Sequence, residues 1–435
     1  MKFFALLVLL FAFTAYLEIN AQIYHPCAFD SWLQTQPDFH EIMDQWTADS
    51  RRDKDFLRDD IYTIQVVFHI VYNQDIQNIS DDVILEQMVK LNQDYRRLNP
   101  DAILTRDEFL PVAADAHIEF ELAQFDPEGN PSNGITHNLT ERAGFVLDFF
   151  SLENTLDEVK SSETGGVNPW DPTRYLNIWV CNIMDTGFGQ IFGISYPPLN
   201  APNWPVEYYE ASLAVSGVVM HYTCPGPNNP TATIDGYDFN DGGRTLTHEV
   251  GHFLGLRHIW GDAYFNGCSV DDGILDTPNC FSQDNFVCNH NINSCSGEIP
   301  NLPDMVENYM DYSGDDCMNI FTREQVDMMR WVLTNLRPDL VEGQFVSVPL
   351  VSVGDQVEVY PNPATDQINF ACSENLLGTV LFLYDSRGLI VDSFRIISTK
   401  QNTSVAHIPA GVYYLSAGIE KPNFKTQRLF IAPQH

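Results

Sequence analysis

Residues 248–262, HEVGHFLGLRHIWGD, bring together side chains that can bind a metal ion. On a helix that turns about 100° per residue, His248 and His252 lie on one face. Gly255 can adopt a positive φ and turn the chain back, which would bring His258 to the same centre. Three neutral imidazoles suit zinc and leave its fourth coordination position open. The spacing therefore predicts a catalytic zinc site with His248, His252 and His258 as the ligands.

Glu249 follows the first predicted ligand and distinguishes a catalytic site from a structural one. It is too close along the helix to share the metal comfortably, but it can take a proton from water at the open position. A structural zinc would normally close that position with a fourth protein ligand. This motif is typical of peptidases. The pattern favours a secreted zinc endopeptidase over the alternative, a surface-displayed binding protein or adhesin that retains a structural zinc.

The segments that must position this motif predict a mixed, twisted sheet with helices packed against it. Four stretches rich in β-branched and aromatic residues are expected to form strands: 61–73, 117–125, 174–183 and 216–223. One helix is expected from Asp81, capped by Ser80, to Leu98. Another is expected to begin at a capping box, Thr322 to Gln325, and to end before Pro338. The predicted fold class of this part is α+β.

Composition and charge indicate an exported protein with several parts. The 435 residues include 59 acidic and 23 basic ones, for a net charge of -36. Such a surface disfavours nucleic acid as a partner. The first residues resemble a signal peptide, and no later apolar stretch is long enough to span a membrane. The predicted parts are a signal peptide (1–21), a pro-segment (22–58), a catalytic domain (59–340), a linker (341–354) and a β-sandwich domain (355–435).

The motif helix, together with NYMDYS at 308–313, resembles the metzincin metallopeptidases. The finer pattern is similar to the pappalysin group, peptidase family M43, and its cytophagalysin-like bacterial members in particular. The supporting stretches are RYLNIWV, TLTHEVGH, DTP, NYMDYSGDDCM and FTREQ, within roughly 61–336. The resemblance implies a metzincin-like catalytic domain with one catalytic zinc and with protein or peptide substrates. It also implies that Met310 forms a hydrophobic floor beneath the zinc and that Tyr312 stabilises the oxyanion.

The resemblance implies two further sites. Asp315 matches an aspartate that lines the pocket for the residue after the cut, and a carboxylate there would favour cleavage before Arg or Lys. The loop at 268–280, CSVDDGILDTPNC, carries oxygen ligands that suit structural calcium, which relatives bind in this loop. Asp272, Asp276 and the carbonyl of Thr277 are the expected calcium ligands. An ordinary acidic turn is the alternative.

The chain has nine cysteines, which in an exported protein indicates disulfide bonds. The resemblance implies two bonds, Cys268 with Cys295 and Cys288 with Cys317. The pairing of Cys181, Cys224, Cys280 and Cys372 stays open, with Cys224 to Cys280 as one possibility.

Cys27 lies six residues after the predicted signal cut. In zinc peptidases of this type, a pro-segment thiolate often fills the fourth zinc position and displaces water, which keeps the enzyme latent. Relatives usually have Arg-Cys-Gly where this chain has Pro-Cys-Ala, so the match is partial. The resemblance therefore implies a zymogen in which Cys27 is the fourth ligand. Activation would require a cut near the Ser50-Arg51-Arg52 run, which reads as an accessible linker.

The final segment, about 355–435, reads as strands separated by turn residues. VYPNPATDQINF, LFLYDSRGLIV and IPAGVYYL resemble the C-terminal sorting domain of the type IX secretion system. This resemblance implies that the type IX machinery is a partner and that the protein is secreted or attached to the cell surface. A carbohydrate- or protein-binding sandwich domain is the alternative.

Overall fold

The computed structural model describes most of the chain and divides it into two compact units, Met1–Gln344 and Phe345–His435. The described residues are 25–29, 39–52, 60–147, 155–184, 190–198, 214–232, 241–262, 267–281, 288–297, 300–342, 357–372, 376–385, 390–417 and 427–432. The predicted signal peptide and most of the predicted linker lie outside these residues.

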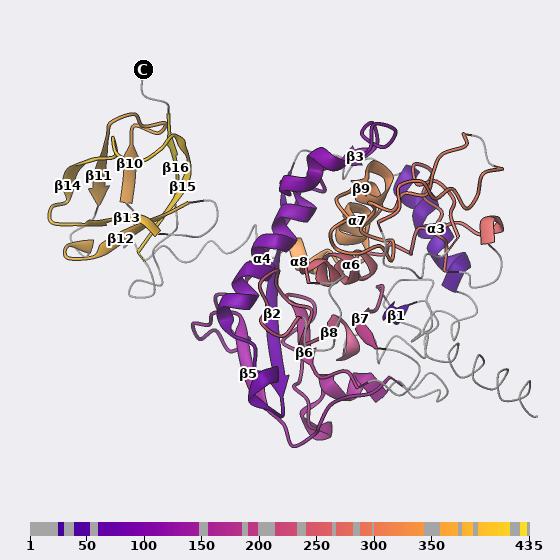
Figure 1. The fold of residues 1–435 in the computed structure, drawn as a ribbon. Helices are drawn as coiled ribbons and strands as arrows, with labels where there is room; N and C mark the ends of the chain where they lie inside the picture. Colours follow the sequence, from indigo (N-terminus) through magenta and orange to yellow (C-terminus); the bar gives the residue numbers. More distant parts are fainter. Residues whose placement is uncertain are drawn as a thin grey trace, which may run out of the picture. The chain divides into compact units, whose positions relative to one another are not determined.

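A mixed seven-stranded sheet is the framework of the first unit (Figure 1). Its strand order is β1-β7-β8-β6-β2-β4, and β5 also pairs with β2. Neighbouring strands are parallel, except that β7 runs antiparallel to β8. The strands are β1 (His25–Cys27), β2 (Tyr62–Tyr72), β4 (Ile118–Leu122), β5 (Ile135–Leu139), β6 (Leu176–Cys181), β7 (Ile191–Ser195) and β8 (Val218–His221). A separate antiparallel pair joins β3 (Ala113–Ala114) to β9 (Phe321–Thr322).

Strand β2 shows why this sequence forms a central strand. It is buried almost continuously from Val66 to Val71 rather than on alternate residues. A parallel strand that is covered on both faces needs apolar side chains on both, so its sequence reads as a run instead of an alternation. The predictions of strands at 61–73, 117–125, 174–183 and 216–223 are confirmed by β2, β4, β6 and β8. Strands β1, β5 and β7 of this sheet were not predicted.

Three helices position the histidine motif: α4 (Asp81–Tyr95), α6 (Arg244–Phe253) and α7 (Arg323–Asn335). α6 packs against α4, β7 and β8. α7 begins at the predicted capping box, in which Thr322 and Gln325 cap each other's backbone. α4 is shorter than predicted, because Arg97 adopts a φ of 47° and leaves Leu98 outside the helix and 68% exposed. Helix α8 (Asp339–Glu342) follows α7, and five 3-10 helices cover Asp75–Gln77, Pro100–Leu104, Thr155–Lys160, Ser162–Thr164 and Gly267–Ser269.

The predicted pro-segment contains a helix that the sequence reading did not anticipate, α3 (Phe39–Arg52). It buries Ile42, Met43 and Trp46 and packs against α7 (Figure 1). Ser50 to Arg52, which were expected to lie in a linker, form the last turn of α3 instead, whereas residues 53–59 lie outside the described residues. Arg51 there pairs with Glu324 of α7, with 3.1 Å between Nε and Oε2. The amphipathic pattern of this helix, with a buried tryptophan at its centre, explains why it docks.

The second unit is an all-β domain with its own core. Its two sheets have the strand orders β10-β11-β14 and β13-β12-β15-β16. In β12, Leu381 and Leu383 are buried while Phe382 and Tyr384 are half-buried, so alternate residues face the core. The strands are β10 (Val357–Tyr360), β11 (Gln367–Cys372), β12 (Val380–Tyr384), β13 (Ile390–Arg395), β14 (Lys400–Ser404), β15 (Gly411–Ser416) and β16 (Gln427–Ile431).

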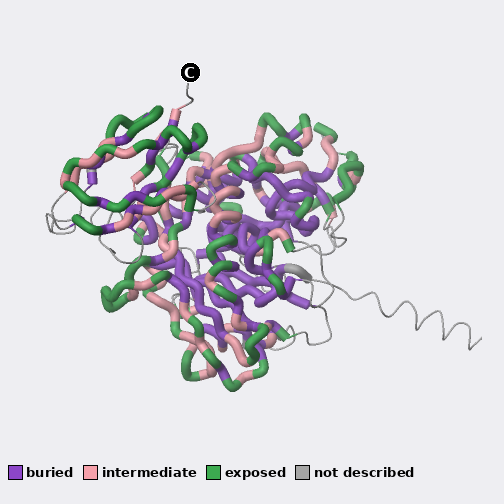
Figure 2. Tube along the Cα trace, turned by 60° about the vertical axis from the view of Figure 1, so that its left-hand side comes forward, coloured by how far each residue is buried: buried purple, intermediate pink, exposed green. Residues whose placement is uncertain are grey.

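The structure confirms the predicted fold class: a mixed sheet with helices, followed by an all-β domain. Each unit has a large hydrophobic cluster of its own, and these can be followed as buried stretches in Figure 2. Among the described residues, the helices are all too short or too polar to cross a membrane.

Candidate metal centre and active site

The three predicted ligand histidines converge on one point. The Nε2 atom of His248 lies 3.1 Å from that of His258 and 3.1 Å from that of His252. The Nε2 atoms of His252 and His258 are 3.2 Å apart. His248 and His252 share one face of α6. Gly255, at a φ of 89°, then turns the chain so that His258 reaches the same point. The left-handed conformation explains why a glycine stands at this position.

The hydrogen bonds of the three rings show that this point suits a cation. The Nδ1 atoms of His248 and His252 lie 2.7 and 2.8 Å from the backbone carbonyls of Tyr309 and Leu256. Carbonyls only accept hydrogen bonds, so both Nδ1 atoms carry the proton and both Nε2 atoms present lone pairs. Burial lowers the pKa of His248 to about 3 and that of His252 well below its ordinary value, so the rings are neutral. Converging lone pairs repel one another unless a metal ion lies between them, and zinc suits such a set.

Glu249 is fully buried beside this centre, and strand β7 lies against it. A Cβ built on Gly193 of β7 would be 2.5 Å from Oε1 and 2.7 Å from Cγ of Glu249. Only a glycine at this position leaves room for the carboxylate. Sequence reasoning missed Gly193, because its importance depends on which strand neighbours α6.

Met310 lies directly beneath α6 and is fully buried. A Cβ on Gly251, which stands between the two histidines of the helix, would be 2.4 Å from its Sδ. The backbone of Met310 also accepts a hydrogen bond from the N–H of Ile259 at 3.3 Å. The residue therefore packs under the ligand-bearing helix and its turn, where the resemblance puts a hydrophobic floor.

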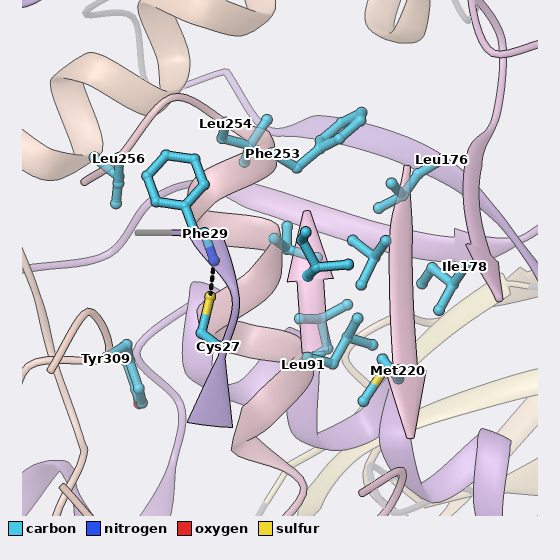
Figure 3. Close-up of a cluster of buried hydrophobic side chains, with 14 of the residues drawn as sticks. Cys27, Phe29, Leu91, Leu176, Ile178, Met220, Phe253, Leu254, Leu256 and Tyr309 are labelled. Carbon is cyan, nitrogen blue, oxygen red and sulfur yellow. Dashed lines mark hydrogen bonds between the residues drawn. The ribbon is translucent and has the colours of Figure 1, made fainter. Parts of the chain in front are cut away.

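Cys27 comes close to the three histidines although it is more than 200 residues away in the sequence. Its Sγ and one ring nitrogen of each histidine all lie within 4.8 Å of one another, and all four residues are buried. β1 holds Cys27 by pairing parallel to β7, with Cys27 opposite Gly193. The N–H of Phe29 donates to Cys27 Sγ at 3.3 Å, as Figure 3 shows. A donor to sulfur favours the thiolate, which is the form that binds a metal.

Phe29 and Tyr312 hold the segment around Cys27 over the centre. The ring of Phe29 stacks on His252 with 3.9 Å between centroids, and it is fully buried. The hydroxyl of Tyr312 donates to the carbonyl of Cys27 at 3.0 Å. The Tyr312 ring also packs edge-on against His258, at 4.7 Å. The hydroxyl that the resemblance assigns to the oxyanion is thus engaged by the pro-segment in this structure.

Asp315 lies at the N-terminal end of α6 and is buried. Its Oδ2 accepts a hydrogen bond from the N–H of Arg244 at 3.0 Å, and the guanidinium of Arg244 pairs instead with Asp94 and Asp101. Burial raises the pKa of Asp315 to about 6. The side chain therefore lies next to the helix that carries the ligands, and its charge depends on pH near neutrality.

The three predicted calcium ligands make hydrogen bonds within the protein. The hydroxyl of Thr277 donates to both carboxylate oxygens of Asp272, at 3.0 and 3.1 Å. Asp276 accepts the N–H of Glu324 at 3.0 Å, near the start of α7. Arg51 of α3 donates to the carbonyl of Gly273 in the same loop. Calcium at this loop stays a prediction.

Two disulfide bonds are present, Cys268–Cys295 and Cys288–Cys317. They are the two pairs that the resemblance implies, and both lie in the segment between His258 and β9. Cys224 and Cys280 are buried thiols in the structure and are not bonded to each other. That possible pairing is therefore wrong.

Family models match both units of the chain. A model described as pregnancy-associated plasma protein-A, peptidase family M43, matches residues 228–334. A model described as a secretion system C-terminal sorting domain matches residues 358–432. An extracellular metalloprotease of Arthroderma benhamiae is 26% identical over 278 residues, which cover 63% of this chain and 73% of the relative. One from Arthroderma otae is 39% identical over 151 residues, which cover 34% and 47%.

Solved structures of one bacterial enzyme resemble the first unit. A promirolysin variant from Tannerella forsythia has 36% sequence identity and a TM-score of 0.61, and the match covers 73% of this chain and 97% of that one. Mature mirolysin from the same organism, solved with a cleaved peptide, has 39% identity and a TM-score of 0.56, with 66% and 99% covered.

Proposed function

This chain belongs to the M43 or pappalysin family of zinc metallopeptidases, and from that premise we propose that it is a latent endopeptidase that, once activated, cuts before Arg or Lys. The family identifies a zinc metalloendopeptidase that acts on peptide bonds. The sorting domain and the extracellular relatives identify a secreted or cell-surface protein. The adhesin alternative is not favoured. The observation that carries the proposal is the convergence of Cys27, His248, His252 and His258 within 4.8 Å.

The proposed reaction assigns a separate task to each of the side chains gathered at the site. His248, His252 and His258 would hold zinc, which when bound supplies a Lewis acid that polarises the scissile carbonyl and activates water. Glu249 takes the proton from the attacking water and delivers it to the leaving amine. The Tyr312 hydroxyl stabilises the negative charge that develops on the carbonyl oxygen. Met310 supports the ligand helix from below and does not bind the metal.

Latency is proposed because the N-terminal segment engages two of these positions at once, the open metal position and the Tyr312 hydroxyl. The Cys27 thiolate would fill the coordination position that water needs. The Cys27 carbonyl accepts the hydrogen bond of the Tyr312 hydroxyl, which is then not available to the substrate. The match to promirolysin covers a larger share of this chain than the match to mature mirolysin, 73% against 66%, which supports a pro-segment here. Activation would then require removal of β1 from the edge of β7.

Cleavage before Arg or Lys is proposed from Asp315. A buried carboxylate beside the ligand helix would attract a cationic side chain of the substrate, and a charge-assisted hydrogen bond of this kind is worth about 1.5–3 kcal/mol. The net charge of -36 would also draw basic peptides toward the enzyme.

The decisive experiment incubates the activated protein with a proteome-derived peptide mixture and maps every cut by mass spectrometry. We expect cuts with Arg or Lys directly after the scissile bond, abolished by a zinc chelator and restored by added zinc. A Glu249→Gln variant, which keeps the shape of the side chain, serves as the matched control and should cut nothing. Cuts without a basic residue would refute the specificity, and the absence of chelator-sensitive cuts would refute the active site.

A further inference from the structure

Each ligand histidine is oriented through its second ring nitrogen, and one of the three is oriented by a carboxyl side chain. His248 and His252 use the backbone carbonyls described above, whereas Nδ1 of His258 lies 2.5 Å from Oδ1 of Asp262. Asp262 is buried with 3% exposure, and its Oδ2 has no hydrogen-bond partner among the described residues. A buried carboxylate with an unsatisfied oxygen is costly, so a purely structural role explains it poorly.

The backbone around Asp262 is shaped to aim this carboxylate at His258. Gly261 and Asp262 have φ values of 72° and 63°, and aspartate is one of the few residues with a side chain that tolerates this region. A Cβ on Gly261 would be 2.5 Å from the carbonyl oxygen of Asp271, so the turn is closed tightly. Trp260 completes the support, since its ring stacks on the His258 ring at 4.3 Å with 4° between the planes. The Trp-Gly-Asp sequence after the motif therefore supports the third histidine.

We propose that Asp262 is a positioning residue of the metal centre that fixes His258 as its most basic ligand. Its carboxylate keeps the proton on Nδ1, which leaves the Nε2 lone pair directed at the metal. Its negative charge strengthens that nitrogen as a donor in a way that a neutral carbonyl does not. The inference rests on the proposed zinc centre and adds a fourth side chain to it, outside the metal-binding motif itself.

Zinc affinity measured by competition with a chromogenic chelator tests this role without depending on activity. Activated protein carrying Glu249→Ala avoids self-digestion and forms the background for every variant. We expect Asp262→Asn, which keeps a neutral acceptor and tolerates the positive φ, to weaken zinc binding about tenfold. Asp262→Gly, which removes the acceptor without straining the turn, should weaken it up to about 100-fold. The cobalt-substituted proteins should show a shift in their visible absorption.

Asp304→Asn is the matched control, because Asp304 is also buried and its carboxylate accepts hydrogen bonds from the N–H and the hydroxyl of Ser294, at 2.9 and 2.6 Å. It should bind zinc within twofold of the background protein. If both Asp262 variants fold and bind zinc as tightly as this control, with unchanged cobalt spectra, the inference is overturned and the zinc centre stands. If the background protein itself binds no zinc, the proposed centre fails as well.

Discussion

Among single residues, Asp315 is a buried carboxyl beside the ligand helix. Its carboxylate accepts a hydrogen bond from the Arg244 N–H, while the Arg244 guanidinium donates to the Asp315 backbone carbonyl and pairs with the carboxylates of Asp94 and Asp101. Burial therefore dominates, and it raises the pKa of Asp315 to about 6. A carboxyl whose folded-state pKa is raised is ionised only above that value, so its attraction for a basic substrate side chain switches on near pH 6.

We predict that the preference for Arg or Lys after the cut decreases as the pH falls through about 6. The measurement is the ratio of kcat/KM for two peptides that differ only in Arg or Gln at that position, from about pH 7.5 to about pH 5. The ratio cancels the effects of pH on the steps that both peptides share. Asp315→Asn should lower the ratio about 10- to 100-fold at pH 7.5 and remove its pH dependence. A pH-independent ratio in the unmodified enzyme would contradict the assignment.

At the scale of elements, strand β7 connects catalysis and latency. Gly193 of this strand lies against Glu249, and a Cβ at that position would clash with the Glu249 side chain. The same strand pairs with β1. The carbonyl of Gly193 also accepts the N–H of Ala28 at 3.1 Å. One short strand thus lies against Glu249, the proposed general base, and provides the backbone to which β1 pairs.

We predict that Gly193→Ala lowers kcat by about 100-fold, because the added methyl group must displace the Glu249 carboxylate. Zinc affinity and KM should change little, because the Nδ1 atoms of the three histidines are held by Tyr309, Leu256 and Asp262 and not by Gly193. Steady-state kinetics and the chelator competition measure both. Gly297→Ala is the control, because a Cβ at that exposed glycine meets no atom within 4 Å. Equal losses in both variants would argue against a specific role for Gly193.

β1 and α3 are held at two separate places, by β7 and by α7, and Cys27 of β1 is the residue of these two elements that lies within 4.8 Å of the ligand histidines. We predict that Cys27→Ser gives an uncut proprotein with substantial peptidase activity, because a serine hydroxyl is a far poorer zinc ligand than a thiolate. Phe29→Ala should keep the thiolate ligand but weaken the inhibition by an isolated pro-segment peptide about 10- to 100-fold, through lost burial and stacking on His252.

Hydrolysis of a quenched peptide, with a gel that shows the pro-segment intact, checks the Cys27→Ser prediction. Inhibition of the activated enzyme by synthetic pro-segment peptides checks the one for Phe29→Ala. Glu41→Ala on the exposed side of α3 should leave latency unchanged. A fully silent Cys27→Ser proprotein would mean that a feature other than the thiolate blocks the site.

At the scale of the whole molecule, the two units have separate hydrophobic cores. We predict that a chain ended at Gln344 folds, binds zinc and cuts peptides, with a thermal midpoint of the catalytic unit within a few degrees of that in the full chain. Export should be lost, because the sorting domain is absent. Calorimetry, peptide assays and the distribution between cells and medium provide the measurements. A truncated chain that fails to fold would show that the units depend on each other.

Local sequence alone determined the ligand set and the class of enzyme. His248 and His252 are one helical turn apart, and Gly255 with His258 follows within a few residues, so no long-range contact is needed to predict their convergence. The same holds for the capping box at Thr322 and for the strands that are apolar on both faces. Local spacing fixes which side chains share a face, and the motif fixes the chemistry.

Only the tertiary structure decided which residues from distant parts of the chain meet at that motif. Cys27 faces the histidines because β1 pairs with β7, Gly193 faces Glu249 because β7 lies against α6, and Met310 fits because Gly251 has no side chain. Asp262 reaches His258 through a turn with positive φ that the sequence does not specify by itself. Contacts of this kind depend on strand order and packing. Many residues along the whole chain determine these together, so no short motif reveals them.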